Sequence, residues 1–112
     1  MTTLLILAYN EKSYIYDLIN DYKDSFETII VVDDCSSDGT SDILKKSIEE
    51  NENLNVITNE KNLGAGRSFT IGINKFLKSD SKYLIKIDGD NQFKKKDVLK
   101  LKELITQQDL DF

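Results

Sequence analysis

Two aspartates separated by one glycine, Asp88 and Asp90, are the residues of this sequence best suited to chemistry. They follow a largely apolar run, residues 84–87, which predicts a buried strand that ends in a loop. Gly89 would let the backbone turn so that the two carboxylates converge. Paired carboxylates with little nitrogen or sulfur nearby favour Mg²⁺ or Mn²⁺, ions that often share their sites with phosphate oxygens. A plain polar turn explains these residues equally well, so the rest of the chain must decide.

Polar residues also follow two other apolar runs. Residues 4–8 are apolar throughout and stop at the Tyr-Asn-Glu of residues 9–11, and the β-branched residues 28–32 stop at the two aspartates of residues 33–34. Solvated loops would place polar residues at both ends of strands, whereas these polar and acidic residues gather at one end of three separate strands. This asymmetry favours a functional site.

Strand and helix patterns alternate along the whole chain, which predicts a single α/β domain over residues 1–112. Strands are expected at residues 4–8, 28–32, 54–58 and 83–87, and helices at residues 12–22, from 41 or 42 to about 51, 65–78 and 96–107. The third helix is expected to bury Phe69, Ile73, Phe76 and Leu77. The series predicts a parallel, Rossmann-like sheet of strand order 3-2-1-4 with helices on both faces. Ligands of such sheets bind at the carboxyl ends of the strands, where the chain reverses direction, here between the first and fourth strands.

Composition excludes several classes of function. The chain has 15 basic against 20 acidic residues, a net charge of -5, so a broad attraction to nucleic acid is not expected. It has no histidine and one cysteine, Cys35, which excludes serine–histidine triads, histidine-ligated zinc and an internal disulfide. No apolar run approaches the roughly 20 residues of a membrane span, and no signal peptide is evident, so a cytoplasmic location is the default expectation.

Four stretches, in this order and spacing, resemble the nucleotide-sugar-binding half of family 2 glycosyltransferases with the GT-A fold. They are residues 8–11 (AYNE), 31–40 (VVDDCSSDGT), 62–66 (NLGAG) with Gly72 beyond, and 88–92 (DGDNQ). The resemblance covers nearly the whole chain. The spacing of Gly64, Gly66 and Gly72 is most similar to the polyprenyl-phosphate (dolichol-phosphate) mannosyl- or glucosyltransferase branch. A dinucleotide-binding glycine loop is the other interpretation of Gly64 and Gly66, but these glycines follow the third strand instead of the first.

The resemblance implies a role for each matched residue. Donor binding would involve Ala8, Tyr9, Glu11, Asp33, Asp34, Gly64, Arg67, Asp88 and Gly89, and a Mg²⁺ or Mn²⁺ ion would be held by Asp88, Asp90 and Gln92. Tyr9 would stack on the nucleotide base, an interaction worth about 1–3 kcal/mol. Glu11 and Asp34 would accept hydrogen bonds from base or ribose, whereas Asp33 would mainly brace its loop. The ion would neutralise the charge that builds on the nucleoside diphosphate as it leaves.

The implied reaction is an inverting glycosyl transfer from a UDP- or GDP-linked sugar to a polyprenyl phosphate or another acceptor, in the cytoplasm or at a membrane surface. The family's acceptor half, with its general base, would lie beyond residue 112, so no catalytic base is assigned. The chain departs from the family at Leu7, where proline is frequent, and at Cys35, where glycine is frequent. Lys94 and the two lysines after it could attract an anionic headgroup, but a solvated helix face explains them better.

Two other functions remain open at this point. A truncated chain of this kind could bind nucleotide without catalysing transfer. A receiver-like phosphoacceptor domain would use Asp33, Asp34 and Lys86, although Thr58 and Asn59 stand where such a domain needs a lone aspartate after the third strand. An uncovered fourth strand also predicts self-association.

Overall fold

Four strands alternate with four helices in the computed structural model, which describes residues 1–90 and 92–107. The strands are β1 (Thr2–Ala8), β2 (Thr28–Asp33), β3 (Leu54–Thr58) and β4 (Tyr83–Asp88), and the helices are α1 (Ile15–Tyr22), α2 (Thr40–Glu50), α3 (Ala65–Leu77) and α4 (Lys95–Gln107). Every predicted element is present, with bounds that differ by up to three residues.

The sheet is parallel and has the order β3-β2-β1-β4, as the sequence predicts. Ala8 at the end of β1 pairs in register with Asp33 of β2, and Leu7 pairs with Asp88 of β4. The three polar strand ends therefore meet at one edge. This order also argues against a receiver-like domain, because that fold has the order 2-1-3-4-5 and places its third strand beside the first.

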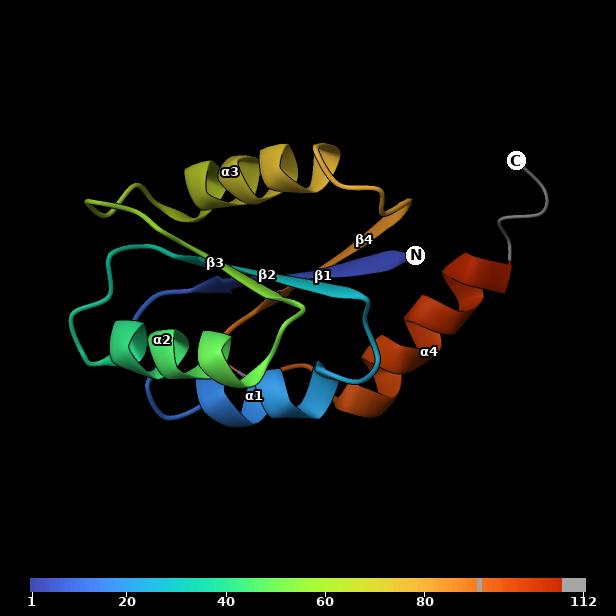
Figure 1. The fold of residues 1–112 in the computed structure, drawn as a ribbon, viewed down its shortest axis with the longest axis horizontal. Coiled ribbons are helices and arrows are strands. Elements are labelled where there is room, and N and C mark those ends of the chain that lie inside the picture. Colours follow the sequence, from blue (N-terminus) through green and yellow to red (C-terminus); the bar gives the residue numbers. More distant parts are fainter. Residues whose placement is uncertain (91, 108–112) are drawn as a thin grey trace.

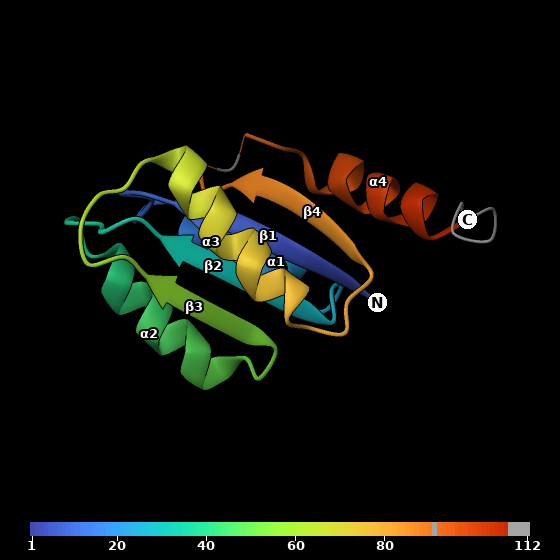
Figure 2. The ribbon, with the colours of Figure 1, turned by 90° about the horizontal axis from the view of Figure 1, so that it is seen from above.

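Helices cover both faces of the sheet unequally (Figures 1 and 2). Helices α1, α2 and α4 lie on one face, where the larger apolar core contains Leu4, Ile6, Ile19, Leu44 and Val98. Helix α3 lies alone on the other face, over a smaller core that the other side chains of β1 and β2 form. Strand β1 is buried along its whole length and contributes side chains to both cores.

Helix α3 packs on the sheet only partly as the sequence predicts: Phe76 packs against the smaller core, but the fully buried positions are small. Its buried positions are Ser68 and Gly72, whereas Phe69 is 37% exposed and Leu77 is 69% exposed. The expectation that Phe69 and Leu77 face the core was wrong. A Cβ atom on Gly72 would lie only 2.5 Å from Cδ1 of the fully buried Leu5, so the helix approaches β1 too closely for large side chains on that line.

This close approach predicts opposite effects for two glycines of the same helix. Gly72→Ala should lower the free energy of unfolding by about 1–3 kcal/mol, because the added methyl overpacks a closed core. Gly66→Ala is the matched control, since a Cβ there meets nothing within 4 Å. It should be neutral or stabilising by up to about 1 kcal/mol through helix propensity. Urea unfolding of the two variants measures the difference, and equal stabilities would contradict the close packing.

Candidate functional site

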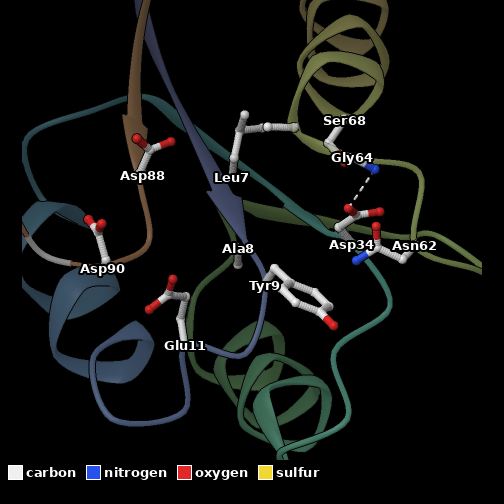
Figure 3. Close-up of a pocket in the computed structure, with 11 residues that line it drawn as sticks. Leu7, Ala8, Tyr9, Glu11, Asp34, Asn62, Gly64, Ser68, Asp88 and Asp90 are labelled. Atoms are coloured by element: carbon white, nitrogen blue, oxygen red, sulfur yellow. Dashed lines mark hydrogen bonds between the residues drawn. The ribbon is translucent and has the colours of Figure 1, made fainter.

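A cleft of about 450 Å³ opens at the carboxyl end of the sheet, between the end of β1 and the loops that follow β2, β3 and β4 (Figure 3). Its lining combines small apolar residues with carboxylates. The lining residues are Leu7, Ala8, Tyr9, Glu11, Asp34, Asn62, Gly64, Ala65, Ser68, Asp88 and Asp90. The cleft therefore lies where the strand order reverses, between β1 and its two neighbours.

One side of the cleft carries three carboxylates, those of Glu11, Asp88 and Asp90 (Figure 3). Burial raises the pKa of Glu11, and the negative charges of Asp90, Asp38 and Asp88 raise it further. The contribution of these three carboxylates indicates an excess of negative charge on this side of the cleft. A bound cation would relieve the repulsion.

Asp88 and Asp90 fit a divalent ion that is shared with phosphate. Among residues 1–90 and 92–107, no group of three acidic, cysteine or histidine side chains is gathered closely enough to form a metal site unaided. Mg²⁺ and similar hard ions, however, are commonly bound through one or two carboxylates together with substrate phosphates. The donor set here is two carboxylates facing an open cleft, which suits that arrangement. Asn91, the residue between Asp90 and Gln92 in the predicted motif, lies outside the described residues.

The opposite side of the cleft is organised by Asp34, which is only 6% exposed. Its carboxylate accepts hydrogen bonds from the backbone N–H groups of Leu63 at 2.7 Å and Gly64 at 2.9 Å, and from the side-chain amide of Asn59 at 3.0 Å. Burial alone would raise the pKa of Asp34, but these hydrogen bonds and one from Ser68 outweigh it and lower the pKa. Asp34 therefore fixes the loop before α3, besides lining the cleft.

Asp33 lies behind the cleft and does not line it. Its side chain is fully buried and accepts hydrogen bonds from the hydroxyl of Ser36 and from the hydroxyl of Ser41 at 2.8 Å. The backbone N–H of Ser36 also donates to it, at 3.2 Å. These contacts match the predicted bracing role and leave no exposed surface for a donor.

The loop after β2 also holds the loop after β1. Asn10 N–H donates to the Ser36 hydroxyl at 2.9 Å, Glu11 N–H to the Thr40 hydroxyl at 3.0 Å, and Lys12 N–H to Asp38 at 3.1 Å. These three contacts are called here the inter-loop hydrogen bonds. They orient the segment that carries Tyr9 and Glu11. Much of the matched stretch 31–40 therefore serves to position the matched stretch 8–11.

Three residues beside the cleft have a positive φ, among them Asn10 with φ of 54°. Gly64 has φ of 92°, and Cys35 has φ of 61°, in the left-handed region that glycine adopts readily and other residues rarely do. The second value explains why glycine suits the position of Cys35. Gly89 has no positive φ; instead, a Cβ there would lie 3.0 Å from Glu11 Cγ and 3.2 Å from the Leu7 carbonyl oxygen. The predicted turn is present at residues 89–90, and both Asp88 and Asp90 line the cleft, but glycine is needed there for space and not for a positive φ.

The structure brings most of the predicted site residues together. Those that line the cleft are Ala8, Tyr9, Glu11, Asp34, Gly64, Asp88 and Asp90. Arg67 and Gln92 are exposed and do not line it, although Gln92 N–H donates to Asp90 at 3.3 Å. Gly89 supports the cleft from behind. Leu7, Asn62, Ala65 and Ser68 also line the cleft but were not assigned as site residues. Asn62 and Ala65 lie in the matched stretch 62–66, whereas nothing in the sequence singled out Leu7 or Ser68 as lining residues.

The family model described as "Glycosyl transferase family 2" matches residues 3–112. The chain is 30% identical, over 116 residues, to a putative teichuronic acid biosynthesis glycosyltransferase of Bacillus subtilis, covering all of this chain and 44% of that protein. It is 28% identical, over 111 residues, to the UDP-N-acetylglucosamine–dolichyl-phosphate N-acetylglucosaminyltransferase of Methanococcus voltae, covering 88% of this chain and 44% of that protein. The chain thus spans less than half the length of these two relatives.

Solved structures share the fold. The S. aureus protein TarS, residues 1–349 in complex with UDP, superposes with a TM-score of 0.76 at 26% identity, covering 96% of this chain and 32% of that one. The mannosyltransferase PcManGT of Pyrobaculum calidifontis, solved with GDP-mannose and Mn²⁺, superposes with a TM-score of 0.67 at 22% identity. The match covers 80% of this chain and 27% of that one.

Proposed function

The chain belongs to glycosyl transferase family 2, and we propose that it forms the part of such an enzyme that binds the nucleoside-diphosphate sugar. The donor is UDP- or GDP-linked, and its diphosphate is held through Mg²⁺ or Mn²⁺ at Asp88 and Asp90. The observation that carries this proposal is the cleft with three carboxylates on one side and a glycine loop on the other. The UDP complex of TarS, a protein of the same fold, supports the choice of ligand.

Each side of the cleft suits one part of such a donor. Tyr9 is 48% exposed and lines the cleft, so its ring is available for stacking on a base. The Asp34 carboxylate is an acceptor for ribose or base hydroxyl and amino groups. When bound, the ion would supply Lewis-acid stabilisation of the departing diphosphate. Gln92 would complete the ion's surroundings from the exposed turn after Asp90. Arg67, in the first turn of α3, would meet the diphosphate only from outside the cleft.

Calorimetric titration of the chain with UDP and with GDP, each with and without Mn²⁺, tests this function. Mn²⁺ is the first ion to use because a mannosyltransferase of the same fold was solved with it. Binding of one nucleotide that becomes tighter with Mn²⁺ is the expected result. A folded sample that binds neither nucleotide under any of these conditions would refute the proposal.

Catalysis by the whole enzyme is proposed as an inverting transfer to a polyprenyl phosphate or another acceptor. The relative from Methanococcus voltae, a transferase that acts on dolichyl phosphate by its name, supports this class of acceptor. Because the chain covers 44% of that relative, nucleotide binding without transfer is the second candidate for the chain by itself. Product formation from a UDP- or GDP-sugar and a polyprenyl phosphate would exclude that second candidate.

The surface around β4 supports a further proposal, that the chain self-associates. Strand β4 is at one edge of the described sheet. Large apolar side chains lie exposed on both flanking helices and on the turn before α4, namely Phe69, Leu77, Phe93, Leu101 and Leu104. An unpaired edge beside such side chains tends to pair with another copy. Light scattering should give a mass that rises with concentration, and a constant monomer mass up to the highest concentration would contradict self-association.

No helix within residues 1–90 and 92–107 is long and apolar enough to cross a bilayer. The cytoplasmic location, in solution or at a membrane surface, stays a prediction from the sequence.

A further inference from the structure

A cation of the chain itself is already paired with one carboxylate of the cleft. The Nζ atom of Lys86 lies 2.9 Å from Oδ1 of Asp88. The two residues are two positions apart on β4, so their side chains leave the same face of the strand. The side chains are 37% and 46% exposed, respectively. An ion pair that is open to water in this way is weak and can be broken by a competing ligand.

Lys86 also lies beside the cleft. With Leu7, Ala65, Gly66 and Phe69 it lines a shallow groove of about 270 Å³ between α3 and β4. Leu7 and Ala65 belong to both the groove and the cleft, so the two hollows adjoin. An ammonium group that leaves Asp88 can therefore remain near any anion bound in the cleft, because the lysine stem is long and flexible.

The charges explain why the pair forms. Glu11, Asp88 and Asp90 share one side of the cleft, so their negative charges repel one another. The Lys86 ammonium neutralises one of these carboxylates. A divalent ion that binds Asp88 competes with the ammonium for this carboxylate, which costs the ion part of its affinity. A diphosphate that arrives with the ion brings negative charge, which gives the displaced ammonium a new partner.

We propose that Lys86 is a positioning residue that occupies Asp88 until a divalent ion and the nucleoside diphosphate bind together, so that the chain prefers the metal–diphosphate complex to the metal alone. The inference rests on the proposed function, because it needs a diphosphate in the cleft. It assigns a role to a residue that does not line the cleft. In thermodynamic terms, Lys86 raises the coupling between metal and nucleotide, and each ligand then strengthens the other by the same factor.

The test compares Lys86→Met with the wild-type chain in two binding measurements. Electron paramagnetic resonance of Mn²⁺ gives the affinity for the metal alone, and calorimetry gives the affinity for Mn²⁺ together with the nucleotide that the wild type binds. Lys86→Met should bind Mn²⁺ alone about two- to fivefold more tightly, and the Mn²⁺–nucleotide complex about two- to fivefold more weakly, as expected for loss of an exposed ion pair. Lys86→Arg, which keeps the charge, should behave as the wild type does.

The opposite signs distinguish this role from simpler ones. A lysine that only repels cations would, when removed, strengthen both kinds of binding, and a lysine that only supports packing would weaken both. Either result, or no change in either measurement, overturns the inference while wild-type binding upholds the proposed function. If the wild type itself binds no Mn²⁺–nucleotide complex, the proposed function fails and the inference fails with it.

Two controls keep the comparison sharp. Lys94→Met removes another lysine, from the exposed segment just after the acidic turn. It should not strengthen binding of Mn²⁺ alone while weakening binding of the Mn²⁺–nucleotide complex. Circular dichroism verifies folding, and Lys86→Gln gives the same pair of measurements with a polar neutral side chain if the methionine variant is unstable.

Discussion

Replacing both Asp88 and Asp90 by asparagine should abolish metal-dependent nucleotide binding while leaving the fold intact. The change removes two of the three carboxylates on one side of the cleft, so a divalent ion loses its two charged ligands. Changes even in the groups that support metal ligands cost about 10- to 100-fold in affinity, and loss of two direct ligands should cost at least about 100-fold. Calorimetry with Mn²⁺ and the preferred nucleotide measures the loss.

The matched control is Asp24→Asn combined with Asp80→Asn. These two aspartates are exposed and precede the amino ends of β2 and β4, at the far edge of the sheet. The control changes the net charge by the same two units, so it separates direct ligation from general electrostatic attraction. Equal affinities for the two double variants would show that Asp88 and Asp90 do not hold the ion.

Asp34→Ala should lower the free energy of unfolding by about 2–3 kcal/mol at pH 7. The substitution removes the acceptor of two backbone N–H groups, those of Leu63 and Gly64, and of the Asn59 amide. Because the loop before α3 then loses its anchor, nucleotide binding should weaken as well. Urea unfolding measures the first effect and calorimetry the second, and Asp42→Ala, at an exposed position of α2, is the control for removing one carboxylate.

The loss should depend on pH in a defined direction. The folded-state pKa of Asp34 lies below the ordinary value of 3.8. The charged carboxylate therefore stabilises the folded chain at every pH above about 3.8, and this stabilisation disappears as pH falls through the lowered pKa. The difference between wild type and Asp34→Ala should be constant from about pH 5 to 8 and shrink below about pH 3.8. A difference that stayed constant down to pH 2 would show that the charge contributes nothing.

The fold could be predicted because its signals are local and repeated. Continuous apolar runs such as residues 28–32 can hardly be anything but buried strands, and strict alternation with helices leaves few topologies for a parallel sheet. The start of α1 was less predictable. It begins at Ile15 and not near Lys12, after a turn at residues 12–14. The N–H groups of Glu11 and Lys12, just before and at the start of this turn, donate to the side chains of Thr40 and Asp38. No pattern within residues 9–15 predicts hydrogen-bond acceptors that lie 26 to 29 positions further along the chain.

The candidate site was predictable where charge marks it and unpredictable where packing does. Acidic residues at three strand ends identified Glu11, Asp34 and Asp88, because carboxylates at such ends are hard to explain otherwise. Leu7 and Ala65 line the same cleft but have no chemical signature, since apolar residues of this kind fill every core. The buried face of α3 was predicted only in part. The amphipathic pattern favours large residues such as Phe69, whereas the line of the helix nearest β1, at Ser68 and Gly72, admits only small ones.

The inter-loop hydrogen bonds have a consequence for how a ligand would be recognised. The loop that carries Tyr9 and Glu11 and the loop that carries Asp34 are joined before any ligand arrives, so they are ordered when the chain folds. The conformational entropy of these loops is then lost when the chain folds and not when a ligand binds. A larger part of the free energy of each ligand contact therefore contributes to affinity. Rigid loops also tolerate little misfit, so the same three hydrogen bonds would make the cleft selective for the shape of the base.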